Sequence, residues 1–178
     1  MEILESRIIW DGKWRVRVNT VRMDDGADYE RAMVEHPGAV VLAPLVTTAD
    51  GAPALLMLRQ YRPTLGTLLF ELPAGTREGD EPWLQCAQRE LREETGYRAA
   101  EMISLGEVWA APGMSNERMA LFVATGLTAD PLPMDIDEEI TVETWPLEEL
   151  VAMAIDGRLE DAKSVIAILR LAHHLSQQ

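Results

Sequence analysis

Apolar and polar residues alternate in the first part of the chain, most clearly over residues 14–18. A period of two residues is typical of a strand with one buried face. The turn signal Asp25-Gly26 suits a tight hairpin, and residues 29–35 then read as the returning strand. We therefore predict that residues 1–36 form a small antiparallel sheet.

Two continuous apolar runs follow, over residues 39–46 and 54–58. Short runs without alternation are typical of strands that are covered on both faces. The polar segment 59–63, which ends in a proline, is expected to end the second of these strands. The remaining strands are predicted near residues 103–110, 118–124 and 139–145.

The clearest helix is predicted over residues 82–95. Pro82 fits a first helical turn, where its missing N–H is harmless, and Gly96 is a suitable stop. The apolar positions on one helical face are Leu84, Ala87 and Leu91. We expect this face to pack against the core.

Two more helices are predicted near the C-terminus. The first begins at Pro146 and ends at Gly157, and Asp161 caps the second. The apolar stripe expected on the last helix comprises Val165, Ile168, Leu169 and Ala172. Helices mixed with strands, without a strict strand–helix–strand rhythm, predict an α/β (α+β) fold with a mixed sheet flanked by helices. Residues 37–178 would form this main domain.

The composition supports a folded chain and limits its partners. Of 178 residues, 47% are apolar and 26% are charged, which is ordinary for a soluble globular protein. Lys and Arg number 16 and Asp and Glu number 30, so the net charge is −14. This field repels polyanions, and we expect no nucleic-acid partner. A small anionic substrate would need local arginines or bound cations.

Cysteine usage and hydropathy bear on the cellular compartment. Cys86 is the single cysteine, which excludes an internal disulfide. No apolar run approaches the ~20 residues that cross a bilayer. Residues 1–5 lack the basic segment of a signal peptide. We therefore expect a cytoplasmic protein with no membrane partner.

The candidate chemistry lies on the predicted helix 82–95. Glu90, Glu93 and Glu94 are spaced i, i+3 and i+4, which puts three carboxylates on one side of the helix. Their mutual repulsion would be reversed by a hard divalent cation, for which Mg²⁺ is the natural occupant. Arg89 and Arg92 would offset part of the repulsion. The alternative is a solvated acidic helix face opposite the apolar stripe.

These residues belong to a longer pattern that resembles a known signature. The pattern reads Gly75-x5-Glu81-x7-Arg89-Glu90-Leu91-x-Glu93-Glu94-x-Gly96-Tyr97. It resembles the Nudix box of the Nudix hydrolases, with Tyr97 in place of the usual aliphatic residue. The segments 59–62, 70–75 and 112–118 are similar to those that flank the box in ADP-ribose pyrophosphatases. The resemblance covers about residues 38–175.

The resemblance implies a fold and an activity. The fold would be a Nudix-type α/β/α sandwich with a mixed sheet, joined to the N-terminal antiparallel sheet. The activity would be Mg²⁺-dependent hydrolysis of a nucleoside diphosphate sugar, with ADP-ribose giving AMP and ribose 5-phosphate. The alternatives are another sugar nucleotide, such as GDP-mannose or ADP-glucose, and a Nudix module that senses ADP-ribose without cleaving it.

The resemblance also assigns a metal site. Glu90, Glu93 and Glu94 would hold Mg²⁺, for which Mn²⁺ is a substitute, with the backbone carbonyl of Ala74 as a further ligand. Glu90 and Glu94 are expected as direct ligands. Glu93, binding directly or through a water, is counted with the catalytic residues. Glu81 would support the site.

The general base is expected in the acidic loop 135–139. Aligning the family pattern on Ile140 favours Glu138, with Glu139 next. The alternative is a solvated acidic loop without a catalytic role.

Substrate contacts are assigned to five side chains. Arg59 and Arg62 are candidate phosphate or ribose clamps, because guanidinium groups suit phosphate oxygens. Their alternative is an ordinary ion pair at a strand end, for example with Glu71. Glu117 would anchor a loop or a metal-bound water. Trp14 would stack on the base, or else pack in the core or a dimer interface.

The resemblance finally implies a homodimer. In ADP-ribose pyrophosphatases the N-terminal sheet is commonly exchanged between two subunits and completes the site. Residues 1–36 suit this role, because a sheet of two or three strands is marginal alone.

Overall fold

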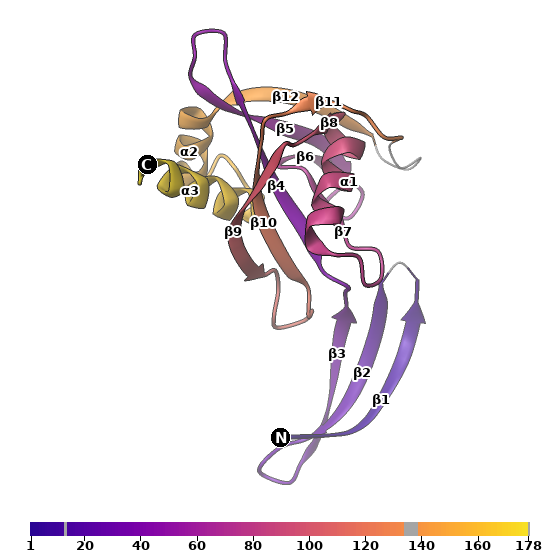
Figure 1. Cartoon of the computed structure of the whole chain (residues 1–178). Helices are drawn as coiled ribbons and strands as arrows, with labels where there is room; N and C mark the ends of the chain where they lie inside the picture. The colour runs from indigo at the N-terminus through magenta and orange to yellow at the C-terminus, as the bar shows by residue number, and fades with distance from the viewer. Residues whose placement is uncertain (13, 134–138, 178) are drawn as a thin grey trace.

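The computed structural model describes residues 1–12, 14–133 and 139–177. It contains two separate bodies of β-structure, a lower N-terminal sheet and an upper main domain (Figure 1). The N-terminal sheet is antiparallel and contains β1 (Glu2–Asp11), β2 (Arg15–Arg22) and β3 (Asp28–Glu35). The antiparallel sheet predicted from residues 1–36 is thereby confirmed. None of the helices in the described ranges has the length and apolarity needed to cross a membrane.

The main domain is built on a seven-stranded mixed sheet. Its path is β12 (Ile140–Pro146), β5 (Pro53–Arg62), β4 (Ala39–Thr47), β10 (Arg118–Thr125) and β9 (Glu101–Trp109). Off this path, β6 (Thr67–Glu71) pairs with β5 and β7 (Ala74–Thr76) pairs with β4. Only the β4–β10 pair is parallel among these described pairings. A small ladder joins β8 (Tyr97–Arg98) to β11 (Thr128–Ala129).

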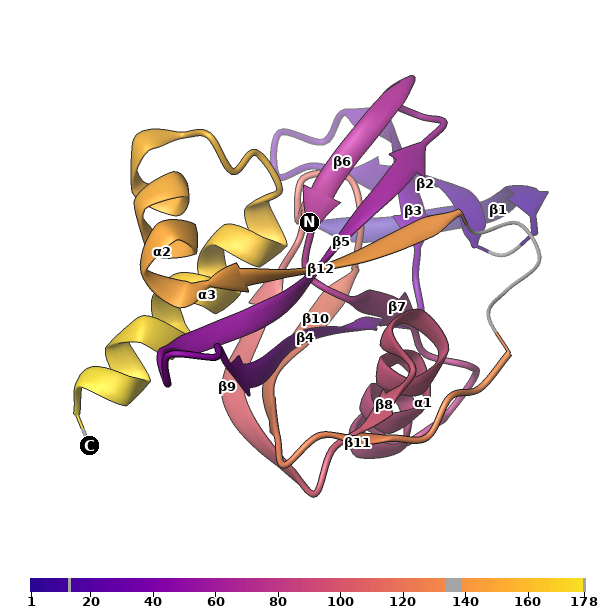
Figure 2. The same cartoon turned by 90° about the horizontal axis from the view of Figure 1, so that it is seen from above.

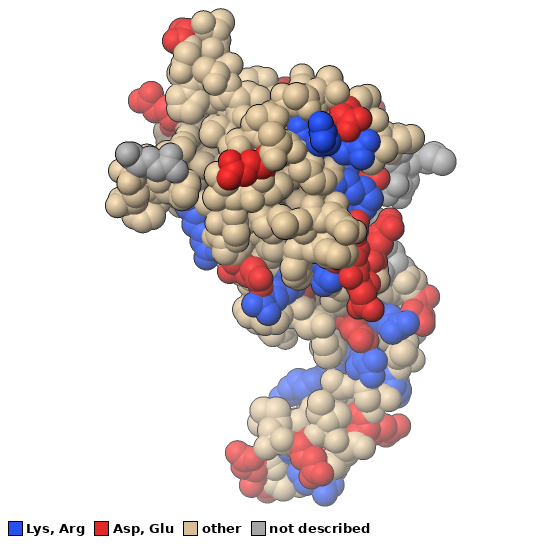
Figure 3. Space-filling view, viewed as in Figure 1, with Lys and Arg blue, Asp and Glu red and all other residues tan. Residues whose placement is uncertain are grey.

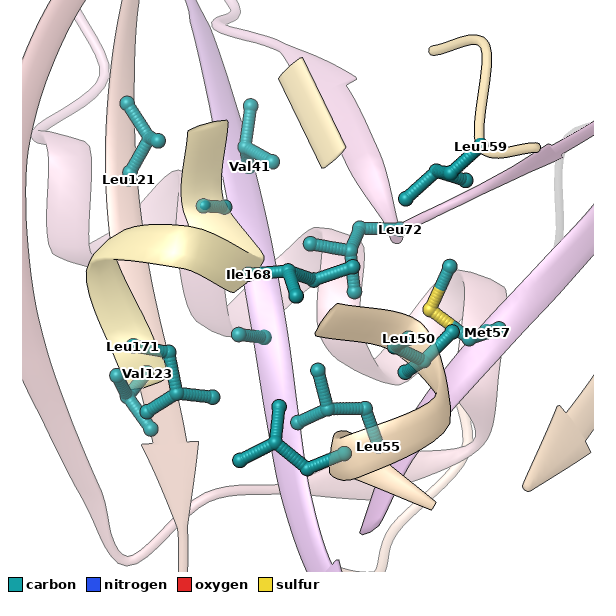
Figure 4. Packing of buried hydrophobic residues seen from close by; sticks show 13 residues of the cluster. Val41, Leu55, Met57, Leu72, Leu121, Val123, Leu150, Leu159, Ile168 and Leu171 are labelled. Carbon is teal, nitrogen blue, oxygen red and sulfur yellow. The ribbon is translucent and has the colours of Figure 1, made fainter. Parts of the chain in front are cut away.

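Helices cover both faces of this sheet (Figure 2). One face carries α1 (Trp83–Thr95), and the other carries α2 (Leu147–Asp156) and α3 (Ala162–Ser176). Strand β4 shows why, because its side chains alternate between the two cores: Val40 and Leu42 face α1, whereas Val41 and Ala43 face α2 and α3. Figure 4 shows the second core, where Ile168 and Leu150 of the helices meet Leu55 and Met57 of β5. The predicted α/β/α layering is confirmed.

The helix ends follow the predicted signals. Gly96 ends α1 with a left-handed φ of 78°, a conformation that glycine adopts without strain. Asp161 caps α3 by accepting a hydrogen bond from the backbone N–H of Ser164. Both helix ends therefore form at the residues that the sequence predicted.

Three predictions about packing were wrong in detail. Strand β5 continues to Arg62 instead of ending at Leu58, because β6 pairs with its polar half. On α1 the buried face is centred between Cys86 and Leu91, and Leu84 lies at its edge and is 54% exposed. On α3 the buried residues are Ser164, Ala167, Ile168 and Leu171, so the stripe is rotated from the predicted one.

Candidate active site

A cavity of about 740 Å³ opens where α1, β7 and the end of β5 meet the N-terminal sheet. Its lining includes Trp14, Gln60, Arg62, Gly75, Glu90 and Glu139. On the surface, acidic side chains gather where the segment between β7 and α1 lies above the N-terminal sheet (Figure 3). The cavity therefore combines arginine with a strongly acidic surround.

Two carboxylates of α1 are buried beside this cavity: Glu90 lines it, whereas Glu94 contacts the backbone of Ala74, which lines it. Glu90 and Glu94 are only 8% and 3% exposed. The backbone N–H of Ala74 donates a hydrogen bond to Glu94 Oε2 at 2.8 Å. A Cβ at Gly75 would lie 1.8 Å from Glu90 Cδ, so only glycine leaves room for this carboxylate. The alternative interpretation, a solvated acidic helix face, does not hold for these two residues.

Arg89 organises the remaining acids of the helix. Its guanidinium donates to Glu81 at 2.9 Å, to Glu90 at 2.7 Å and to Glu93 at 2.9 Å. The hydrogen bond to Glu81 is the main cause that raises the pKa of Arg89, and the same bond lowers the pKa of Glu81. Arg92, expected to share this role, instead donates to the backbone carbonyl of Asp130.

The same residues supply the donors for a metal ion. Within residues 1–12, 14–133 and 139–177, no three acidic, histidine or cysteine side chains are already grouped as a metal cluster. Arg89 binds Glu90 and Glu93 in the present arrangement. The donors are nevertheless all oxygen atoms, and the Glu90 carboxylate lies directly against the backbone at Gly75. This chemistry fits a hard divalent cation.

Arg62 reaches the cavity from the end of β5. It binds Glu71 in a bidentate pair, with Nε–Oε1 and Nη2–Oε2 distances of 2.8 and 2.7 Å. Burial lowers the pKa of Arg62, but the hydrogen bond to Glu71 and the charges of Glu71 and Glu94 outweigh it and leave the pKa raised. Glu71 is fully buried and does not line the cavity. It contacts the cavity only indirectly, by accepting both hydrogen bonds from Arg62.

Arg59 lies on the opposite face of the same strand. Its Nε donates to Glu143 at 2.6 Å, and its guanidinium lies 4.8 Å from the centre of the Phe70 ring. Side chains alternate along a strand, so Arg59 and Arg62, three positions apart, face opposite sides. The structure does not bring these two arginines together, and Arg59 does not line the cavity.

The N-terminal sheet contributes Trp14 to the cavity wall. The Trp14 ring lies 5.8 Å from the ring of His36, whose Nε2 is 3.9 Å from Glu117. Glu117 itself is outside the lining. A seam of backbone hydrogen bonds joins β3 to the loop 111–117, with Val34 bonded to Met114 and Asn116. Trp14 and Glu117 are therefore both neighbours of His36.

The candidate bases are placed only in part. Glu139 lines the cavity. Glu138, which the sequence favoured, lies outside the described residues. The assignment between these two acids stays a prediction.

Gln60 was missed in the sequence. It is 5% exposed and lines the cavity, and its Oε1 has no hydrogen-bond partner among the described residues. An unpaired buried oxygen of this kind is expensive unless a ligand or water completes it. The available signal was its position two residues before Arg62, which places both on one face of β5.

Comparisons with known proteins identify the family of the chain. A family model described as NUDIX domain matches residues 36–167. The ADP-ribose pyrophosphatase of Mycobacterium tuberculosis is 34% identical over 173 residues, covering 94% of this chain and 81% of that protein. The methanol dehydrogenase activator of Bacillus methanolicus is 31% identical over 169 residues, covering 94% and 86%.

A solved structure extends the agreement to the whole fold. The crystal structure of an ADP compounds hydrolase superposes with a TM-score of 0.84 at 23% identity, covering 99% of this chain and 95% of that one. At this identity the likeness concerns the fold, including the N-terminal sheet. The family match carries the assignment beyond the fold, because it spans α1 and all the cavity-lining residues named above except Trp14. The chain therefore belongs to the Nudix hydrolase family, in its ADP-ribose pyrophosphatase-like branch, and is a pyrophosphohydrolase.

Proposed function

We propose that the protein hydrolyses the diphosphate of ADP-ribose to AMP and ribose 5-phosphate with Mg²⁺ as cofactor. The observation that carries this proposal is the pair of buried carboxylates against the cavity backbone: Glu90, which lines the cavity, lies against Gly75, and Glu94 accepts from the N–H of Ala74. Arg62 reaches the same cavity with a guanidinium suited to phosphate oxygens. The name of the mycobacterial relative supports the choice of substrate.

The metal would be held by Glu90, Glu94, Glu93 and the carbonyl oxygen of Ala74, with Mn²⁺ as a substitute. When bound, it would neutralise diphosphate oxygens and lower the pKa of a bound water. Mg²⁺ usually binds through few carboxylates plus substrate phosphate, which suits two buried carboxylates beside a cavity. For this, Glu90 and Glu93 must turn from Arg89, which keeps Glu81 as its partner.

The protein's own residues would then position and activate the reactants. Arg62 would bind the diphosphate, and Trp14 would stack on the base at the far wall. Glu139, or Glu138 beside it, would accept the proton of the attacking water. The water oxygen bonds to phosphorus, the bridging P–O bond breaks, and the leaving phosphate takes up the negative charge. Arg59 and Glu117 bind other residues in this structure, so their substrate roles have less support.

The proposal includes a homodimer formed through the N-terminal sheet. Strand β1 exposes several apolar side chains, with exposed fractions of 62% for Ile3, 47% for Ile8, 52% for Ile9 and 51% for Trp10. Several exposed large apolar side chains on one strand are typical of an interaction surface. A second copy is the natural cover, because the sheet has three strands and little core of its own.

A panel of nucleoside diphosphate sugars tests the proposed substrate. Purified protein with Mg²⁺ should release AMP from ADP-ribose with the highest kcat/KM of the panel. A higher value for GDP-mannose or ADP-glucose would transfer the assignment to that sugar nucleotide. Tight ADP-ribose binding without turnover under Mg²⁺ or Mn²⁺ would instead identify a sensing module.

A further inference from the structure

A buried chain of charges connects the cavity to the beginning of α3. Glu71, fully buried, accepts from Arg62 on one side and from the ammonium of Lys163 on the other. Lys163 Nζ also donates to Asp161 Oδ2 at 2.9 Å. The side chains of Lys163 and Asp161 are only 11% and 12% exposed. Charges of alternating sign therefore run from the cavity to the cap of α3.

A second contact joins the residue after Glu71 to α3. The backbone N–H of Leu72 donates to Ser164 Oγ at 2.7 Å, and Ser164 Oγ donates to Asp161. Two consecutive residues, Glu71 and Leu72, are thus held by the first turn of the helix. Ala74, whose N–H binds Glu94, follows two residues later.

The physical problem at this site is the charge of Glu71. A buried carboxylate without a cation is strongly destabilising. If Arg62 were its single partner, any movement of Arg62 toward a substrate would leave that carboxylate unpaired. Lys163 supplies a second cation to Glu71 and does not itself line the cavity. Within the described residues, Arg62 uses Nε and Nη2 for Glu71, and Nη1 has no protein acceptor.

We propose that Lys163 is a positioning residue that keeps Glu71 paired and so leaves Arg62 able to engage a substrate diphosphate. The inference rests on the proposed function, in which Arg62 contacts the substrate. Lysine suits the role, because its compact ammonium has three donors that rotate to bridge two carboxylates, whereas the fork of arginine is planar. The chain contains only two lysines, at positions 13 and 163.

Steady-state kinetics of Lys163→Met provide the first test. Without Lys163, Arg62 is held on Glu71, so KM for ADP-ribose should rise about tenfold while kcat stays within about threefold. Arg158→Met is the matched control, because Arg158 also carries one positive charge but pairs with Asp156 at the surface. An unchanged KM in a folded Lys163→Met variant would overturn the inference.

A double variant separates positioning from general support. In Lys163→Met/Glu71→Gln no buried charge remains to retain Arg62, so KM should return to within about threefold of the wild type. If Lys163 had a merely structural role, the second substitution would instead raise KM further in the double variant. A KM that stays at the Lys163→Met value or rises further would refute the proposal.

Nuclear magnetic resonance of the wild type gives a readout that needs neither turnover nor a Lys163 variant. Lysine labelled with ¹⁵N at the side chain yields at most two ammonium signals, which Lys13→Arg assigns. Titration with ADP should shift the Lys163 signal as Arg62 turns to the diphosphate. No shift at saturating ADP would overturn the inference. A wild type that cleaves no nucleoside diphosphate sugar would refute the proposed function, and this titration would still decide the role of Lys163.

Discussion

The carboxylate of Glu90 occupies the space beside Gly75 that any side chain at position 75 would need. The two residues belong to different elements, β7 and α1, and at this contact the Glu90 side chain lies directly against the backbone of β7. The pair therefore sets how closely the acidic helix approaches the strand that carries Ala74.

We expect Gly75→Ala to displace Glu90 and to lower kcat/KM by about 100-fold, since small misplacements at a reactive centre have effects of this size. The free energy of unfolding should fall by about 1–3 kcal/mol from overpacking. Gly113→Ala is the control, because a Cβ there meets nothing within 4 Å. Kinetics and urea unfolding check both variants; equal activity would mean that Glu90 does not need its present place.

Glu94→Gln should lower kcat by about 100-fold or more, because a carboxylate that holds a cation cannot be replaced by a neutral amide. The amide oxygen still accepts from the N–H of Ala74, so the thermal midpoint should change little. Glu149→Gln, an exposed position on α2, is the matched control. Turnover that survives in Glu94→Gln would contradict the proposed metal site.

Arg89→Met should destabilise the protein by about 3 kcal/mol at neutral pH, because it removes one partner of a partly buried charge cluster. Arg89 lowers the pKa of Glu81 below its ordinary value. The stability from this pair is therefore present above the unfolded-state pKa and is lost as pH falls through the folded-state pKa.

The difference in unfolding free energy between the wild type and Arg89→Met should consequently narrow as pH falls below about 4.5. Urea unfolding over a pH series measures it, with the exposed Arg98→Met as control. A difference that is the same at acidic and neutral pH would show that the Glu81 pair does not stabilise the fold.

The thiol of Cys86 should be inert in the folded protein. Burial is the main cause that raises its pKa far above the ordinary value, and the charges of Glu90 and Glu81 add to it. A chromogenic disulfide reagent should leave the native chain unmodified and titrate one thiol per chain in guanidinium chloride. Fast labelling of the native protein would show that this part of α1 opens readily.

The double variant Ile8→Glu/Ile9→Glu should convert the proposed dimer to a monomer, because two charges replace exposed apolar side chains of β1. Light scattering after size exclusion should give about twice 19.9 kDa for the wild type and 19.9 kDa for the variant. Ile155→Glu, at an even more exposed apolar position on α2, should leave the mass unchanged. A monomeric wild type would remove the dimer from the proposal.

The three helices and the long strands could be predicted from the sequence because each carries its own signals, whereas the short strands β6, β7, β8 and β11 were not predicted. Gly96 and Asp161 mark helix ends through local backbone chemistry, and both act as predicted. The polar half of β5 could not be recognised in this way, because its partner β6 decides whether it is a strand. Pairing between segments is not encoded in the composition of either one.

The site was predictable where spacing along one element sufficed. The acids of α1 follow from helical periodicity. The separation of Arg59 from Arg62 was not predicted, because both residues were expected beyond the end of the strand that in fact continues to Arg62. The contact between Glu71 and Lys163 joins residues 92 positions apart, and no local sequence pattern predicts it. The burial of Glu90 likewise depends on how closely β7 approaches α1.

The backbone seam between β3 and the loop 111–117 limits how the protein can be divided. A fragment that starts at residue 37 would lack the tryptophan wall of the cavity and the acceptor and donor that Val34 supplies to this loop. Trimming the chain to its family-matched region would thus leave the backbone carbonyl of Met114 and the backbone N–H of Asn116 without their hydrogen-bond partner. Expression for crystallography or engineering should keep the first strands, and fusions belong at the distal C-terminal end.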